Sequence, residues 1–123
     1  MLRQHDRLRR LALAVDDRRH LAGPPRAAGT GLAGLRAAQQ LSPSAIIREI
    51  KTSRLRGWGG AAFPVWKKWE VAATTTADRK YVVANADEGD AGTYCDRMVM
   101  EGDPFVLIEG MTIAAIATGA TQG

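Results

Sequence analysis

A short acidic stretch carries the densest group of side chains able to do chemistry. Asn85-Ala86-Asp87-Glu88-Gly89-Asp90 places three carboxylates within four residues, directly after an apolar segment. Neighbouring carboxylates repel one another, so interactions with other groups must offset that repulsion. The EF-hand calcium pattern fails, because its fifth position falls on Gly89 and its sixth on Asp90. Two interpretations stay open: a solvated turn, or a ligand site at the carboxyl end of a strand.

A glycine-rich stretch is the second candidate. Arg56 to Pro64 reads RGWGGAAFP, with three glycines and two alanines in nine residues. Dense glycine indicates that backbone comes close to another group. The stretch fits G-x-G-x-x-A, but it follows a predicted helix instead of a strand, so the dinucleotide fingerprint does not apply, and the P-loop signature G-K-[ST] is missing. Beside Lys67 and Lys68, its N–H groups are suited to bind an anion. A flexible surface loop is an equal alternative.

Two helices are predicted before the glycine-rich stretch. Leu32 and Leu35 indicate a short helix, with order beginning near Gly29. Ser42-Pro43 reads as the N-cap and first residue of a second helix. Three isoleucines lie on one stripe of that helix, which is expected to end near Ser53; they are Ile46, Ile47 and Ile50.

One strand and two further helices are predicted after it. Residues 81–83 (Tyr-Val-Val) indicate a short buried strand, and residues 98–100 a short helix. Asp103-Pro104 begins the last helix, in which residues 105–120 are expected to be buried. That segment contains Glu109 and is too short to span a membrane. One strand cannot form a sheet alone, so the predicted fold is incomplete.

Composition limits the remaining possibilities. The 123 residues suit one domain, and 46% hydrophobic residues suffice for a core. Residues 1–28 hold seven arginines and three aspartates, whereas the other 95 residues hold ten basic and ten acidic side chains. Nucleic-acid binding would therefore depend on residues 1–28 alone, and we expect none. We expect those residues to be a disordered tail; a transit peptide or a misread start are the alternatives. A single cysteine, Cys95, indicates a reducing, cytoplasmic setting and excludes an iron–sulfur site built from this chain's thiolates alone.

The two motifs together resemble a known family of flavin-bearing, NADH-binding subunits. The family pattern R-G-R-G-G-A-[GA]-F-P-x-G-x-K-W corresponds to RGWGGAAFPVWKKW here, and N-A-D-E-x-[ED]-x-G-[TS]-[YF]-x-D-R corresponds to NADEGDAGTYCDR. The family includes the NADH-oxidising subunit of respiratory complex I and subunits of NAD-linked hydrogenases and formate dehydrogenases. The ending MEGDPFVLIEGMTIAAIATGATQG looks most like the formate dehydrogenase branch. The resemblance covers residue 29 to the end.

The resemblance implies an α/β fold, a partial Rossmann-like FMN/NADH-binding domain truncated before most of its sheet. It implies an NAD(H)-dependent oxidoreductase subunit that passes a hydride between NAD(H) and FMN, and electrons on to iron–sulfur centres. The iron–sulfur cluster and the rest of the site are expected in a missing C-terminal part, so this chain is expected to be an inactive fragment. Its expected partners are other subunits of the complex, with no transmembrane segment. The implied cofactor-binding residues are Gly57, Gly59, Gly60, Phe63, Lys68, Asn85 and Asp87; the implied catalytic residues are Glu88 and Asp90; no metal ligand is implied.

Two tryptophans depart from the family pattern. Trp58 stands where the family has an arginine, which removes a cation next to the expected anion site. Trp66 stands where the family has a glycine, which places bulk where the backbone is expected to turn. These departures favour an alternative, a degenerate module that docks to partner subunits without redox activity.

Overall fold

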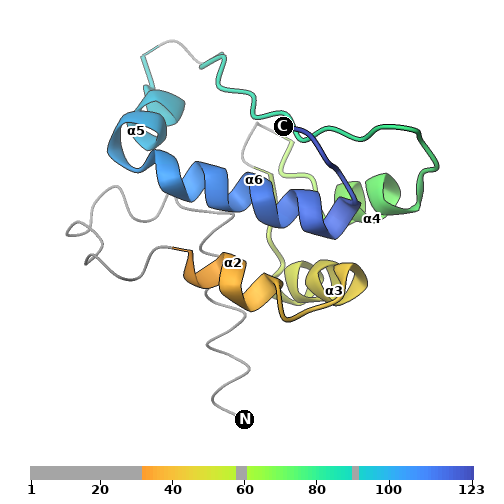
Figure 1. Ribbon diagram of the computed structural model, residues 1–123. Coiled ribbons are helices and arrows are strands. Elements are labelled where there is room, and N and C mark those ends of the chain that lie inside the picture. Colours follow the sequence, from red (N-terminus) through yellow and green to blue (C-terminus); the bar gives the residue numbers. More distant parts are fainter. Residues whose placement is uncertain (1–31, 58–60, 90–91) are drawn as a thin grey trace.

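Five helices form the described part of the protein. The computed structural model describes residues 32–57, 61–89 and 92–123. The helices within these ranges are α2 (Ala33–Ala38), α3 (Pro43–Ser53), α4 (Val65–Thr74), α5 (Cys95–Gly102) and α6 (Pro104–Thr118). In Figure 1, α6 crosses the view, with α2 and α3 below it, α4 near its C-terminal end and α5 at its N-terminal end.

The predicted helix starts are confirmed by their capping hydrogen bonds. The Oγ of Ser42 accepts a hydrogen bond from the N–H of Ala45 at 3.3 Å, with Pro43 as the first helical residue of α3. The Oδ1 of Asp103 accepts one from the N–H of Val106 at 3.2 Å at the start of α6. These caps satisfy backbone donors that a first helical turn leaves free. The short helices α2 and α5 are confirmed as well.

Helix α4 is missing from the element order predicted from the sequence. It occupies Val65–Thr74, between the glycine-rich stretch and the predicted strand. Trp66, Trp69 and Ala73 of this helix pack against the core and recur at helical spacing. Two solvent-facing lysines, Lys67 and Lys68, separate the tryptophans in the sequence. Because these charged residues interrupt the apolar positions, the helical pattern is hard to recognise from the sequence.

The core lies where α2, α3, α4 and α6 meet. Its largest fully buried side chains are Ile46 and Ile50 of α3 and Ile113 of α6. The isoleucine stripe predicted for α3 is therefore confirmed. Apolar area removed from water supplies the main stabilisation here, at about 25 cal/mol per Å².

Helix α6 is buried on one face only, which corrects the expectation of a wholly buried helix. Phe105 and Ile108 expose 73% and 57% of their surface. The opposite face packs on the core and carries a buried carboxylate, Glu109, whose Oε1 accepts a hydrogen bond from the N–H of Leu35 at 2.8 Å. That N–H belongs to the first turn of α2, so Glu109 caps α2 from another helix. A helix that is apolar on all sides, as α6 is, is normally buried on all sides. The exposed face of α6 is therefore suited to contact with further protein.

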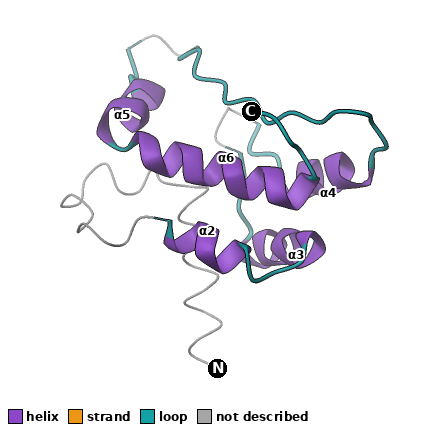
Figure 2. Cartoon of the chain, viewed as in Figure 1, coloured by secondary structure: helices purple, strands orange, loops and turns teal. Residues whose placement is uncertain are grey.

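The prediction of a buried strand at residues 81–83 is wrong. Tyr81 and Val83 expose 56% and 82% of their surface, and Figure 2 draws the segment as loop. Tyr81 forms an isolated parallel bridge with Gln122, and the N–H of Val82 donates to the carbonyl of Gln122 at 2.9 Å. Within the described ranges these pairings are isolated bridges, so the extended segment has a partner on one edge alone. The described fold is thus mostly helical, with two parallel extended pieces joined through α5 and α6.

No helix in the described ranges is long and apolar enough to cross a membrane.

Candidate functional site

The glycine-rich stretch is closed by a short backbone neck between α3 and α4. Arg56 and Pro64 form an antiparallel bridge, and the N–H of Gly57 donates to the carbonyl of Phe63 at 2.8 Å. The Nη1 of Arg56 donates to the carbonyl of Ala62 at 3.1 Å. These bonds fix both ends of the stretch. They also occupy the N–H of Gly57, so that group is not available to donate to a ligand.

Ala62 adopts a strained backbone conformation at the end of this neck. Its φ of 49° lies in the left-handed region, which residues with a Cβ adopt at a cost. Strain of this kind persists where the surrounding hydrogen bonds hold it. A Cβ on Gly57 would meet the carbonyl oxygen of Phe63 at 3.6 Å, an ordinary contact, so sterics in the neck do not require that glycine.

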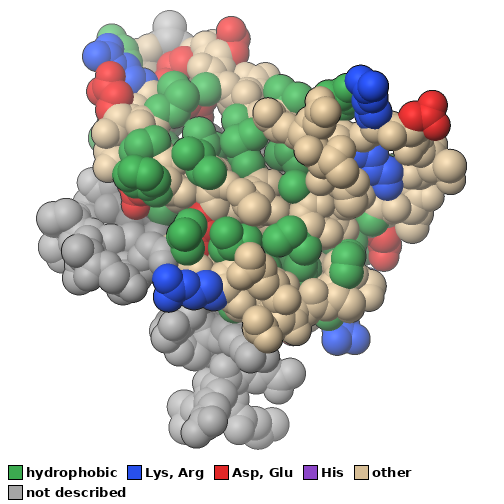
Figure 3. Space-filling model, in the orientation of Figure 1, with side chains coloured by type: hydrophobic (Ala, Val, Ile, Leu, Met, Phe, Trp, Pro, Cys, Tyr) green, Lys and Arg blue, Asp and Glu red, His purple; other side chains and the backbone are tan. Residues whose placement is uncertain are grey.

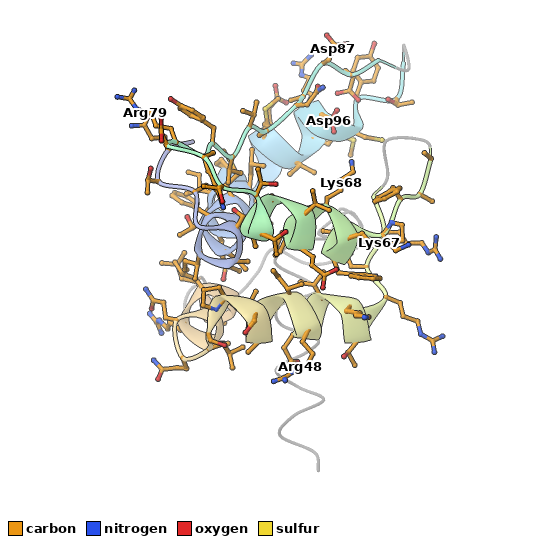
Figure 4. The ribbon with its side chains drawn as sticks, turned by 90° about the vertical axis from the view of Figure 1, so that its right-hand side faces the viewer. Arg48, Lys67, Lys68, Arg79, Asp87 and Asp96 are labelled. Atoms are coloured by element: carbon orange, nitrogen blue, oxygen red, sulfur yellow. The ribbon has the colours of Figure 1, made fainter. Side chains whose placement is uncertain are left out.

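An open groove runs along α4 next to the neck. It has a volume of about 540 Å³ and a mainly apolar lining; the lining residues are Phe63, Trp66, Lys67, Lys68, Glu70, Val71 and Ala72. The Nζ of Lys68 lies 5.8 Å from the ring centroid of Phe63. Figure 4 shows Lys67 and Lys68 projecting from the first turns of α4. Lys68 points to the side of α4 on which Asp87 of the acidic stretch lies. Two ammonium groups beside an apolar surface suit a flat ring that carries an anionic group.

The acidic stretch is organised by its own hydrogen bonds. The Oδ1 of Asn85 accepts a hydrogen bond from the N–H of Asp87 at 3.0 Å, which forms an Asx turn. Glu88 follows with a left-handed φ of 57°. This turn leaves Asp87 exposed and directs the next carboxylate toward α5.

Glu88 caps the N-terminus of α5. Its carboxylate accepts hydrogen bonds from the N–H of Arg97 at 3.0 Å, from the N–H of Asp96 at 3.1 Å and from the hydroxyl of Thr93 at 2.9 Å. The bond from the Arg97 backbone is the largest cause that lowers the pKa of Glu88 below its ordinary value, followed among the favourable causes by the Thr93 hydroxyl. These donors, at the positive end of a helix, offset the repulsion among the carboxylates.

The structure separates the predicted site residues into two groups. Phe63 and Lys68 lie together at the groove, whereas Asn85, Asp87 and Glu88 lie on the extended segment that leads to α5. In Figure 1 that segment passes above α6, from the end of α4 to the start of α5. Gly59, Gly60 and Asp90 lie outside the described residues.

Two basic residues matter that sequence reasoning missed. The Nζ of Lys51 on α3 lies 4.3 Å from the ring centroid of Trp66. The Nζ of Lys80 donates to the carbonyls of Ala73 and Thr118, at 3.1 and 3.2 Å, at the C-terminal ends of α4 and α6. Neither lysine belongs to a sequence motif, so no local signal indicated these contacts.

Trp66 does not disturb a turn as its departure from the family pattern suggested. It lies in the first turn of α4, half-buried, and packs against the core. The chain turns before it, at the neck formed by Arg56 and Pro64.

Among the described residues, no group of three His, Cys, Asp or Glu side chains is placed to hold a metal ion.

Comparison with known proteins finds one family and several curated relatives. Residues 50–123 match the family described as the Nuo51 FMN-binding domain. The NADP-reducing hydrogenase subunit HndC of Solidesulfovibrio fructosivorans is 46% identical over 93 residues, 76% of this chain and 19% of that protein. An NADH-quinone oxidoreductase subunit of Rhizobium meliloti is 46% identical over 94 residues, 76% of this chain and 22% of that protein. The NAD-reducing hydrogenase HoxS subunit alpha of Cupriavidus necator is 43% identical over 83 residues, 68% of this chain and 14% of that protein. The chain thus spans about a fifth or less of the length of these relatives.

Proposed function

The chain belongs to the Nuo51 FMN-binding domain family, and from this premise we propose that it contributes the flavin-phosphate side of the cofactor site in an NADH-oxidising subunit. The observation that carries the proposal is the groove on α4, where the predicted residues Phe63 and Lys68 come together. An apolar surface beside a lysine suits the two parts of FMN, a flat ring system and a phosphate.

The candidate residues would contact different parts of FMN and NADH. Lys68 would hold the phosphate as a point charge, and Phe63 would line the ring or the nucleotide beside it. When bound, FMN accepts a hydride from NADH and releases electrons singly. Asn85 and Asp87 would reach the flavin from the extended segment, and Glu88 and Asp90 would lie on the NADH side. The hydrogen bonds at α5 keep Glu88 ionised, so it would serve as a fixed negative charge.

Several finer features belong to the same proposal. Residues 80–82 pair in parallel with residues 121–122, and helices join the two segments. This pairing supports the proposal that they begin a Rossmann-like sheet. Relatives named as subunits of hydrogenases and quinone oxidoreductases support work within a multisubunit complex. The single cysteine, Cys95, is the basis for proposing a reducing compartment such as the cytoplasm. The formate dehydrogenase branch rests on the resemblance of residues 100–123. An iron–sulfur centre would be supplied by other cysteines, since this sequence has one.

A second candidate function is a docking module without redox activity. Figure 3 shows hydrophobic side chains gathered over α5 and the N-terminal half of α6, where Met98, Phe105 and Ile108 are exposed. An apolar surface of this kind favours contact with more protein. This candidate expects no flavin binding, whereas the first requires it.

Equilibrium titration separates the two candidates. The chain is titrated with FMN and with riboflavin, which lacks the phosphate, and the flavin fluorescence is followed. We expect FMN to bind more tightly, and Lys68→Met to weaken FMN binding about fivefold without changing riboflavin binding, because one exposed charge pair is lost. Arg48→Met is the matched control, since Arg48 projects from α3 away from α4 (Figure 4). Absence of FMN binding would favour the docking module.

A further inference from the structure

We propose that Lys51 and Lys67, gathered on Trp66, form an auxiliary phosphate-binding pair beside the glycine-rich stretch. The proposal rests on the proposed function and assigns two further residues to the recognition of the flavin phosphate. In this interpretation Trp66, the second departure from the family pattern, compensates for Trp58, the first. Trp58 stands in place of the family's arginine, and Trp66 holds two other cations on its ring, at the start of α4.

The first observation is the convergence of two lysines on one ring. The Nζ of Lys51 lies 4.3 Å from the ring centroid of Trp66, and the Nζ of Lys67 lies 5.6 Å from it. The lysines come from different helices, α3 and α4. An indole is the best aromatic partner for an ammonium group, and both distances lie within the range of a cation–π contact. Trp66 itself is held by packing against the core, so the ring is a fixed platform for both charges.

The second observation is the position of this platform. Trp66 lies two residues after Pro64, which forms the neck with Arg56. It lines the groove together with Phe63, Lys67 and Lys68.

The third observation is the imbalance of charge at the groove. Lys67 and Lys68 line it and are exposed, and Glu70 is the one carboxylate among its described lining residues. Lys51, also exposed, adds a third cation at the Trp66 ring from α3. Ammonium groups gathered on one ring repel each other, and a bound dianion would relieve that repulsion. A phosphate ester on a flat heterocycle satisfies the charges and the apolar groove at once.

The test compares FMN with riboflavin on the full chain and on variants. Lys51→Met, Lys67→Met and the double variant keep the aliphatic stems, so packing on Trp66 is retained. We expect each single change to weaken FMN binding roughly two- to fivefold and the double change to weaken it more than either, with riboflavin binding unchanged. Because both lysines share one ring, we expect their effects to be coupled and not simply to multiply. The salt dependence of FMN binding should also become shallower in the double variant, because fewer exposed charges contribute. Arg48→Met, an exposed cation of α3, should leave both flavins unaffected.

The outcomes separate this inference from the function on which it rests. A wild-type chain that prefers FMN, together with a double variant that keeps the same preference, would overturn the auxiliary pair and leave the proposed function intact. Equal losses of affinity for FMN and riboflavin would also overturn it, because the lysines would then not recognise the phosphate. A wild-type chain that binds neither flavin would contradict the proposed function, and the auxiliary pair with it. Circular dichroism of each variant checks that the helices are unchanged.

Discussion

Lys80 joins the C-terminal ends of α4 and α6, and its removal should destabilise the fold. Its ammonium donates to the carbonyl of Ala73 at 3.1 Å and to the carbonyl of Thr118 at 3.2 Å. These carbonyls lie at the C-terminal ends of α4 and α6, where the helix dipoles are negative. The carbonyl of Lys80 also accepts a hydrogen bond from the N–H of Thr121 at 3.3 Å. One residue thus fixes α4, α6 and the start of the segment that carries the acidic stretch.

The magnitude follows from the two hydrogen bonds. A hydrogen bond to a charged group contributes about 1.5–3 kcal/mol when it is shielded from water. Lys80 is half-buried, and water can replace part of each bond, so Lys80→Met should lower the free energy of unfolding by about 2 kcal/mol in total. With a urea slope of about 1 kcal/mol per M, the unfolding midpoint should fall by roughly 2 M.

Urea unfolding followed by far-ultraviolet circular dichroism measures the effect. Arg79→Met is the matched control, because Arg79 is the preceding residue and projects outward from the helices (Figure 4). We expect the control to change the midpoint little. Equal midpoints for Lys80→Met and Arg79→Met would refute the account, since the two carbonyls would then not depend on the ammonium.

Three further changes test the helix caps. Glu109→Ala removes the buried acceptor for the N–H of Leu35 and should cost about 1–3 kcal/mol in urea unfolding, with Glu109→Gln less harmful because it keeps an oxygen; equal stability of both variants and wild type would count against the cap. Glu88→Gln should speed amide hydrogen exchange at the start of α5, whereas Asp87→Asn should not. Because the folded pKa of Glu88 is lowered, its stabilisation is complete above its ordinary pKa of 4.5 and is lost as the pH falls through the folded value. A stability difference between wild type and Glu88→Gln that does not change with pH would contradict this. Ser42→Ala should destabilise α3 by about 1 kcal/mol in thermal unfolding, and an unchanged midpoint would show that Pro43 alone starts the helix.

Local features were predictable from the sequence because their causes are local. Ser42-Pro43 and Asp103-Pro104 each place a side-chain acceptor and a proline at a helix start, and both starts are confirmed. The isoleucine stripe of α3 follows from helical periodicity, and the buried Ile46 and Ile50 agree with it. The motifs were also sufficient to identify the family, since both fall within the matched residues 50–123.

Features that depend on distant residues were not predictable. The burial expected for Val83 failed because burial of a strand requires neighbours on both faces, and apolar residue types do not supply them. Glu88 was assigned to a ligand site, and a ligand role for it stays a prediction; the structure shows it bonded to backbone N–H groups eight and nine residues later. The contact of Lys51 with Trp66 joins two helices, and nothing in the spacing of these residues indicates it.

A chimera tests the central claim, that this chain contributes a flavin site to an NADH-oxidising subunit. The recipient is the related NADH-quinone oxidoreductase subunit of Aquifex aeolicus, which is 45% identical over 92 residues. Its matched segment is replaced by the corresponding residues of this chain. Flavin content is then measured by absorbance, and NADH-dependent ferricyanide reduction is assayed. We expect the purified chimera to retain stoichiometric FMN and to reduce ferricyanide, and Lys68→Met to weaken its FMN binding about fivefold. A folded chimera that carries no FMN would contradict the claim.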